Sequence, residues 1–197
     1  LPLTDVMGTG HHANVLGRVR PGATVAVVGD GAVGLCAVLG AARLGAERIL
    51  ALGHHDERLQ IATSFGATEV LTSSGDELIE SVHESTDGGA ECVLECVGNQ
   101  GAMETAVAIA RPSGTVSFVG VPAEVDTVDA MRLFQNNIAL NGGVAPVRAY
   151  LPELLADAVA GTLDPSPVLD LTVDLDGVPD GYAAMDERRT VKVMVAP

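Results

Sequence analysis

The sequence predicts an α/β fold in which helices cover both faces of a doubly wound parallel sheet. Apolar runs rich in Val and Ile alternate with helix-like segments, which is typical of repeated strand–helix–strand units. Several runs, such as Thr24–Val28 and Cys92–Cys96, are apolar almost throughout rather than at every second position. Strands of that kind are covered on both faces, as in parallel sheets.

The alternation gives the order of the elements. The strands expected in the sheet are Thr24–Val28, Arg48–Leu52, Glu69–Leu71, Cys92–Cys96, Thr115–Val119 and Ile138–Asn141. The helices expected are Asp5–Leu16, Ala32–Leu44, Asp56–Phe65, Asp76–Glu84, Gln100–Ala110 and Asp129–Gln135, followed by Tyr150–Val159, Val178–Met185 and a last strand at Val191–Val195. Gly45, Gly66 and Gly114 stand where left-handed residues end helices, and Ser74–Glu77 has the spacing of a capping box.

Composition excludes several classes of partner. The chain has 197 residues, 47% of them apolar, and a formal net charge of −15. A surface that acidic repels phosphate backbones and anionic lipids, so we expect neither nucleic acid nor membrane as a partner. The odd number of cysteines, Cys36, Cys92 and Cys96, matches no zinc spacing, and all three stand in apolar runs. We therefore expect buried thiols and a reducing, cytoplasmic location.

The stretch Gly29-Asp30-Gly31-Ala32-Val33-Gly34 is a G-x-G-x-x-G run. It directly follows a predicted strand and opens a predicted helix, which is the context that a dinucleotide fingerprint requires. Gly29 would allow the tight turn, Gly31 the approach of the pyrophosphate, and Gly34 the close packing of helix on strand. The sequence therefore predicts a Rossmann-type dinucleotide site, the alternative being a glycine-rich turn without a nucleotide.

The end of the second strand carries Gly53 where an acid would bind the ribose of NAD. Glycine removes both the charge and the bulk that would exclude the extra phosphate of NADP. His54, His55 and Arg58 could then contact that phosphate, which indicates NADP rather than NAD. Two alternatives stay open: the histidines as ordinary solvated residues, and Asp56 as an acid that reaches the ribose.

Residues 15–148 are expected to form the dinucleotide-binding domain, because the strand–helix pattern changes beyond Val144. Residues 1–14 and residues 149–197 then flank this domain as pieces of another part of the protein; the family resemblance described below implies that they are segments of a catalytic domain. Because the sequence starts at Leu1 without an initiator Met, we expect it to be part of a longer protein. Both flanks should expose apolar surface.

An ordered set of motifs carries a resemblance that covers essentially the whole chain. The stretches are "GTGHHANV", "VRPGATVAVVGDGAVGL", "RLGAERIL", "FGATEVL", "ECVG", "RPSGTVSFVGVP" and "LNGGVAP". Together they resemble the cofactor-binding half of a zinc-dependent medium-chain alcohol dehydrogenase. The resemblance implies hydride transfer between NAD(P) and a small alcohol or carbonyl substrate, with a homodimer or tetramer in the intact protein.

The resemblance also assigns residues. It places the pyrophosphate on residues 29–33 and the adenosine ribose near Gly53, His54 and His55. The remaining cofactor positions that it implies are Val97, Gly98, Val119, Gly120, Val121, Ala139, Leu140, Asn141 and, near the pyrophosphate, Lys192. Ordinary packing at the ends of strands, and a solvated charge for Lys192, are the alternatives.

Asp5 resembles the third protein ligand of the catalytic zinc, although a helix N-cap is its plain alternative. The family's other zinc ligands, its proton relay and much of its substrate pocket precede this segment, so we expect no catalytic residue here and no turnover by the chain alone. His11 and His12 are weaker candidates. Three functions compete with this one: a zinc-free quinone or enoyl reductase of the same superfamily, a non-catalytic nucleotide-binding module and a methyltransferase. Asp5 argues against the zinc-free reductase, and Gly53 argues against the methyltransferase.

Overall fold

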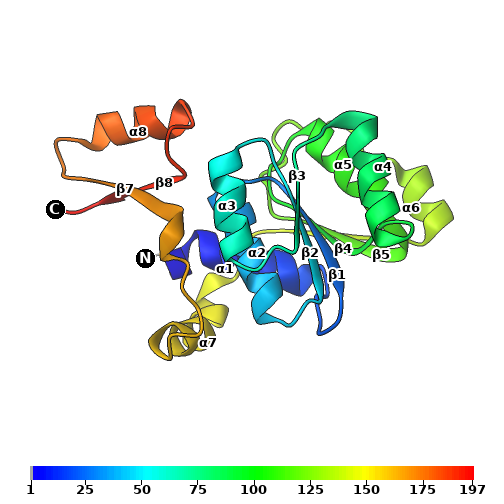
Figure 1. Cartoon of the computed structure of the whole chain (residues 1–197), viewed down its shortest axis with the longest axis horizontal. Coiled ribbons are helices and arrows are strands. Elements are labelled where there is room, and N and C mark those ends of the chain that lie inside the picture. Colours follow the sequence, from blue (N-terminus) through cyan, green and yellow to red (C-terminus); the bar gives the residue numbers. More distant parts are fainter. Residues whose placement is uncertain (1) are drawn as a thin grey trace.

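The computed structural model describes residues 2–197, so Leu1 lies outside the described residues. Six parallel strands form a single sheet in the order β3-β2-β1-β4-β5-β6 (Figure 1). The strands are β1 (Thr24–Val28), β2 (Arg48–Leu52), β3 (Glu69–Leu71), β4 (Ala90–Glu95), β5 (Ala110–Phe118) and β6 (Ala139–Gly142). Because all six are parallel, their carboxyl ends lie along one edge.

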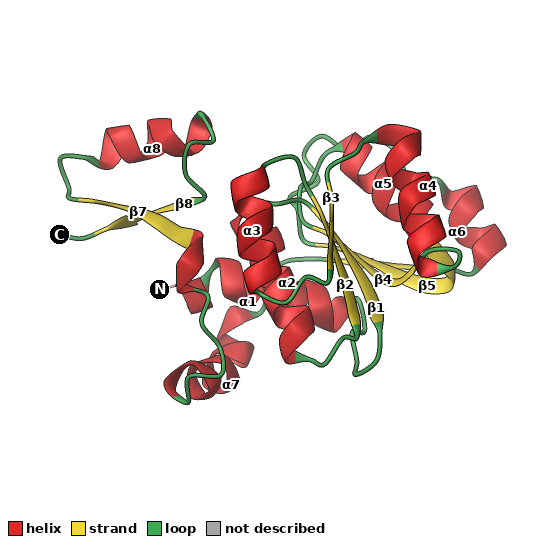
Figure 2. Ribbon diagram, in the orientation of Figure 1, coloured by secondary structure: helices red, strands yellow, loops and turns green. Residues whose placement is uncertain are grey.

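Helices cover both faces of this sheet (Figure 2). One face carries α1 (Val6–Leu16), α2 (Ala32–Arg43) and α3 (Asp56–Ser64), and the other carries α4 (Gly75–Thr86), α5 (Gln100–Ile109) and α6 (Ala130–Asn136). Each face has its own apolar core, and the middle residues of β1 and β4 alternate between the two. The predicted doubly wound sheet is confirmed, and its strands begin and end within two residues of the predicted limits, except that β5 begins five residues earlier than predicted, at Ala110.

One predicted helix end and one predicted side-chain cap are wrong. Gly114 ends no helix, because α5 passes directly into β5 at Ala110, and the left-handed residue of that segment is Ser113. Ser74 precedes α4, but its side chain makes no capping hydrogen bond. Asn99 and Asp129 cap α5 and α6 instead, each accepting a backbone N–H three residues ahead at 2.8 Å. Gly45 and Gly66 are left-handed, as predicted.

The C-terminal residues form an arm that stands apart from the six-stranded sheet (Figure 1). After α7 (Val147–Val159), a two-stranded parallel sheet of β7 (Leu169–Val173) and β8 (Lys192–Val195) is connected by α8 (Val178–Asp186). The strand β7 was not predicted. Leu175 and Tyr182 are 66% and 69% exposed, which agrees with the expectation of apolar surface on the flanks. No helix among residues 2–197 has both the length and the apolar character needed to span a bilayer.

Helix α1 packs on α2 through an unusually close backbone approach. A Cβ on Gly10 would lie 2.6 Å from the backbone nitrogen of Ala37. The amide of Asn14 locks the pair, since its Nδ2 donates to the carbonyl of Gly10 at 2.8 Å and to that of Ala37 at 2.9 Å. The segment before the sheet is therefore part of its core layer.

We predict that Gly10→Ala lowers the free energy of unfolding by about 1–3 kcal/mol, because the added methyl group must push two helix backbones apart. Urea unfolding followed by circular dichroism measures the change. Gly101→Ala is the matched control: it also lies in a helix, but its Cβ would meet nothing closer than 3.8 Å. A Gly10→Ala chain as stable as the control would contradict the close approach.

Candidate cofactor site

The chain reverses its direction of winding between β1 and β4, which are neighbours in the sheet although two strands separate them in sequence. Ligands of open α/β sheets bind in the crevice at such a switch point, outside the carboxyl ends of the strands. A cavity of about 840 Å³ opens there. Of the predicted cofactor residues, those that line it are Gly29, Asp30, Gly31, Gly53, His54, His55, Arg58 and Val97.

The glycine loop has the geometry that its sequence predicts. Gly29 has a φ of 112°, and a Cβ on Gly34 would lie only 1.9 Å from the carbonyl oxygen of Gly29. Gly31 precedes the first turn of α2, and a Cβ there would meet nothing within 4 Å. The open space before the unpaired N–H groups of a helix start fits a pyrophosphate. Ala32, Val33 and Gly34 form that first turn.

The space above Gly53 is not vacant. A Cβ on Gly53 would lie 2.5 Å from Cβ of Asp30 and 2.6 Å from its Oδ2. Asp30 reaches across from the glycine loop to the end of β2 and places its carboxylate where the second strand lacks one. The interpretation that Gly53 leaves this place without an acid is therefore corrected: residue 53 is small because Asp30 fills the space beside it.

The Asp30 carboxylate is anchored by the turn that begins α3. Its Oδ2 accepts hydrogen bonds from the backbone N–H groups of His54 and His55 at 2.7 and 2.9 Å, and lies 2.8 Å from Nδ1 of His55. Burial would raise the pKa of Asp30, but the hydrogen bonds from the His55 side chain and these two N–H groups outweigh it and lower that pKa. Asp30 is thus a fixed negative charge at neutral pH.

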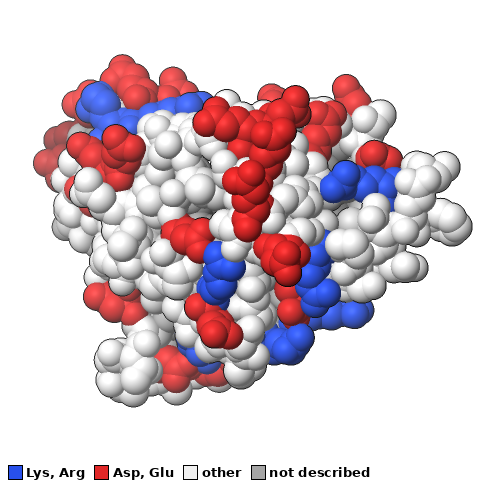
Figure 3. Space-filling view, turned by 45° about the vertical axis from the view of Figure 1, so that its right-hand side comes forward, with Lys and Arg blue, Asp and Glu red and all other residues white. Residues whose placement is uncertain are grey.

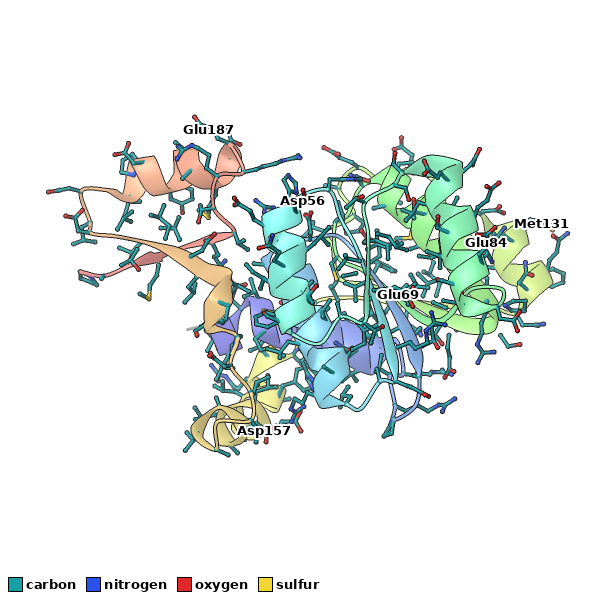
Figure 4. All side chains as sticks on the ribbon, in the orientation of Figure 1. Asp56, Glu69, Glu84, Met131, Asp157 and Glu187 are labelled. Carbon is teal, nitrogen blue, oxygen red and sulfur yellow. The ribbon has the colours of Figure 1, made fainter. Side chains whose placement is uncertain are left out.

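Arg58 connects this end of the cavity to the C-terminal arm. Its Nη2 donates to the carbonyl of Thr190 at 3.1 Å, and its Nη1 lies 3.8 Å from Oδ1 of Asp30. In Figure 4 the label Asp56 marks the first turn of α3 and Glu187 the end of α8; Arg58 of α3 contacts the backbone that follows α8. Arg58 therefore holds the arm against the cavity as well as contributing charge.

The nicotinamide end of the predicted site is formed by two tight turns after β4 and β5. A Cβ on Gly120 would lie 2.3 Å from the backbone nitrogen of Gly98, so the two turns pack on each other. The structure thereby brings the positions 97, 98, 119, 120 and 121 to one place, next to the cavity wall formed by Val97. Positions 139–141 lie one strand further along, in β6 paired with β5.

Beneath these turns, Glu95 is completely buried. Its Oε1 accepts hydrogen bonds from the N–H groups of Val97 and Gly98, both at 2.7 Å, while Oε2 has no hydrogen-bond partner among the described residues. Burial raises the pKa of Glu95 despite these two hydrogen bonds. The residue fixes the turn beside the cavity but is itself sealed from it.

His11 and His12 do not reach the cofactor cavity. Both are buried between α1 and α7, where Nε2 of His11 lies 2.9 Å from Glu153 and Nδ1 of His12 lies 2.8 Å from the hydroxyl of Tyr150. Desolvation lowers the pKa of each imidazole. Their role in the structure is to join the two flanking helices.

The comparisons with known proteins agree with this geometry. Residues 32–160 match the family model described as zinc-binding dehydrogenase. The chain belongs to the zinc-binding dehydrogenase family. It is 36% identical over 190 residues to the "probable zinc-binding alcohol dehydrogenase" of Mycobacterium tuberculosis, covering 95% of this chain and 48% of that protein. It is 32% identical over 173 residues to the NADP-dependent isopropanol dehydrogenase of Entamoeba histolytica, covering 85% and 47%.

Solved structures of alcohol dehydrogenases share the fold. The alcohol dehydrogenase TADH from Thermus sp. ATN1 superimposes with a TM-score of 0.91 at 32% identity, covering 100% of this chain and 57% of that one. Zinc-dependent alcohol dehydrogenase 2 from Streptococcus pneumonia gives 0.90 at 28% identity, covering 96% and 56%. The chain thus spans about half the length of the curated relatives that it matches, and it represents the cofactor-binding half of the family.

Two residues that the family resemblance assigned lie together elsewhere. Lys192 does not line the cofactor cavity; its Nζ lies 2.9 Å from Oδ2 of Asp5. Asp5 makes no capping hydrogen bond to α1, so its plain alternative as a side-chain cap is excluded. No group of three or more His, Cys, Asp or Glu side chains within residues 2–197 could hold a metal ion. These residues do not form a zinc site alone, and Asp5 remains predicted as a single ligand of one.

Sequence analysis missed several residues of the cavity wall. Ser73, Ser74 and Gly75 follow β3, and Asn99 and Gly101 begin α5, where any parallel sheet of this kind presents loops to the crevice. Arg188 comes from the distant arm, and its position follows from the contact with Arg58. The loop residues could have been found from the strand ends alone, whereas Arg188 could not.

We predict that Glu95→Gln removes a pH-dependent loss of stability. The folded-state pKa of Glu95 is raised above its ordinary value of 4.5, so wild-type stability falls as the pH rises from there through the folded-state pKa. The free energy of unfolding of the variant minus that of the wild type should therefore increase between about pH 5 and about pH 8. Urea unfolding at both pH values measures it, with exposed Glu80→Gln as the control. A constant difference would show that Glu95 is not buried as described.

Proposed function

We propose that this chain binds NADP(H), with NAD(H) as the weaker ligand, as the cofactor half of a zinc-dependent alcohol dehydrogenase. The observation that carries the proposal is the open cavity at the switch point, which begins at a glycine loop without a side chain in the way of a pyrophosphate. Relatives named NADP-dependent isopropanol dehydrogenase support the phosphorylated cofactor.

Local charge is needed for such a ligand, because the protein as a whole is strongly negative. Figure 3 shows Asp and Glu side chains spread over one face, with Lys and Arg gathered in a few small groups. Long-range attraction therefore works against an anionic cofactor. The cationic residues at the adenosine end, Arg58 and Arg188, are accompanied by the imidazole of His54, which is an exposed residue.

Each part of the site has a separate task in the proposal. The start of α2 holds the pyrophosphate, the turns at Val97–Gly98 and Val119–Val121 shape the nicotinamide side, and the turn after β2 takes the adenosine ribose. The bound nicotinamide supplies the hydride acceptor or donor. A small alcohol or carbonyl compound is the proposed substrate of the intact protein, with zinc bound partly through Asp5.

The proposal also includes the setting of the intact protein. A cytoplasmic location agrees with the buried, unpaired thiols of Cys36 and Cys92. A homodimer or tetramer would give the edge strand β6 a partner, since an unpaired edge needs protection.

Fluorescence titration of this chain with NADPH and with NADH tests the proposal directly. We expect both to bind, NADPH with the lower Kd, and 5′-AMP to compete with each because it occupies the same adenosine end. A chain that binds neither cofactor would overturn the proposed function, and a lower Kd for NADH would overturn the preference.

We predict that Arg188→Ala weakens NADPH binding by about tenfold and leaves NADH binding nearly unchanged, since one charge-assisted contact to the extra phosphate is lost. Arg189→Ala is the matched control, because the Arg189 side chain pairs with Glu187 and does not line the cavity. Equal losses for both cofactors, or the same loss in the control, would show that Arg188 does not contact the phosphate.

A further inference from the structure

Asp30 stands at the position that decides between the two cofactors. Where a second strand ends in an acid, that carboxylate accepts hydrogen bonds from the adenosine ribose and repels the phosphate of NADP. Here the strand ends in Gly53, yet the Asp30 side chain lies within 2.6 Å of where a Cβ on residue 53 would be. The acid is present, but it is supplied by the glycine loop.

The anchoring of Asp30 occupies donors that an anionic ligand would use. The N–H groups of His54 and His55, at the beginning of α3, both point at Oδ2 of Asp30. Nδ1 of His55 lies at the same oxygen. A phosphate on the ribose would therefore have to compete with a carboxylate that is already bound to these groups.

The second oxygen of Asp30 is available to a ligand. Oδ1 accepts no hydrogen bond within residues 2–197, and the cation near it, Nη1 of Arg58, is 3.8 Å away. Asp30 lines the cavity, while its side chain is only 10% exposed and cannot swing freely into solvent. Held in this way, it is a fixed acceptor in the wall of the cavity.

Other charged residues share the cavity wall with Asp30. Arg58 and Arg188 line the cavity with His54 and His55, and Asp76 and Glu104 add negative charge from α4 and α5. Cationic side chains attract the extra phosphate, while Asp30 opposes it and accepts a hydrogen bond from a free 2′-hydroxyl. The two effects act on the same atom of the cofactor.

We propose that Asp30 is a specificity-determining residue, which replaces the acid missing from the second strand, accepts the adenosine 2′-hydroxyl of NAD(H), and reduces the preference for NADP(H). This inference rests on the proposed function, because it concerns the cofactor bound in the same cavity. Its consequence is that the chain accepts both cofactors rather than excluding one.

The test compares Kd values for NADH and NADPH in wild type, Asp30→Asn and Glu57→Gln. Asparagine keeps an oxygen that can accept the N–H groups of His54 and His55, so the turn is preserved while the charge is lost. We expect the affinity of NADPH relative to NADH to rise about tenfold in Asp30→Asn. Glu57→Gln removes an equal charge from the exposed first turn of α3 and should change that ratio less than twofold or so.

A measurement on the wild type alone covers the case in which Asp30→Asn fails to fold. Competition of NAD⁺ and 2′-deoxy-NAD⁺ against bound NADH should show about fivefold weaker binding of the deoxy compound, because the hydrogen bond to Asp30 is lost. Equal competition, or an unchanged NADPH-to-NADH ratio in folded Asp30→Asn, would overturn the inference while leaving the proposed function intact. A wild-type chain that binds neither cofactor would overturn both.

Discussion

The cofactor site depends on how closely α2 approaches β1. A Cβ on Gly34 would lie 1.9 Å from the carbonyl oxygen of Gly29, so no other residue allows this helix to begin directly beside the strand. Because α2 begins there, its unpaired N–H groups face the crevice between β1 and β4. The same tight loop determines where Asp30 stands, and hence what lies above Gly53.

The elements of the sheet were predictable because their signal is local. Runs such as Thr24–Val28 and Arg48–Leu52 are apolar after their first residue since both of their faces are covered, and the glycine loop lies directly between a strand and a helix. The strand β7 was missed although its side chains alternate, because it belongs to an arm with little core of its own. Its partner β8 lies about twenty residues further along the chain.

The glycine loop of the candidate site was predictable because it depends on backbone geometry. Gly29, Gly31 and Gly34 could be assigned because the motif requires a residue without a side chain at each of these positions. Asp30 stood inside that motif but at a variable position, and its role depends on the distance to a turn 23 residues further on. Lys192, which the resemblance assigned, does not line the cavity, because its long side chain pairs with the nearby acid Asp5.

The arm and the site are connected through a short stretch of backbone. Arg58 holds the carbonyl of Thr190, and Lys192, two residues later, pairs with Asp5 before α1. Asp170 of β7 holds the same stretch of backbone by accepting hydrogen bonds from the N–H groups of Val191 and Lys192. Since Arg188 directly precedes the anchored stretch, its place in the cavity wall depends on these contacts. The position of the Arg188 charge in the cavity wall thus depends on residues at both ends of the chain.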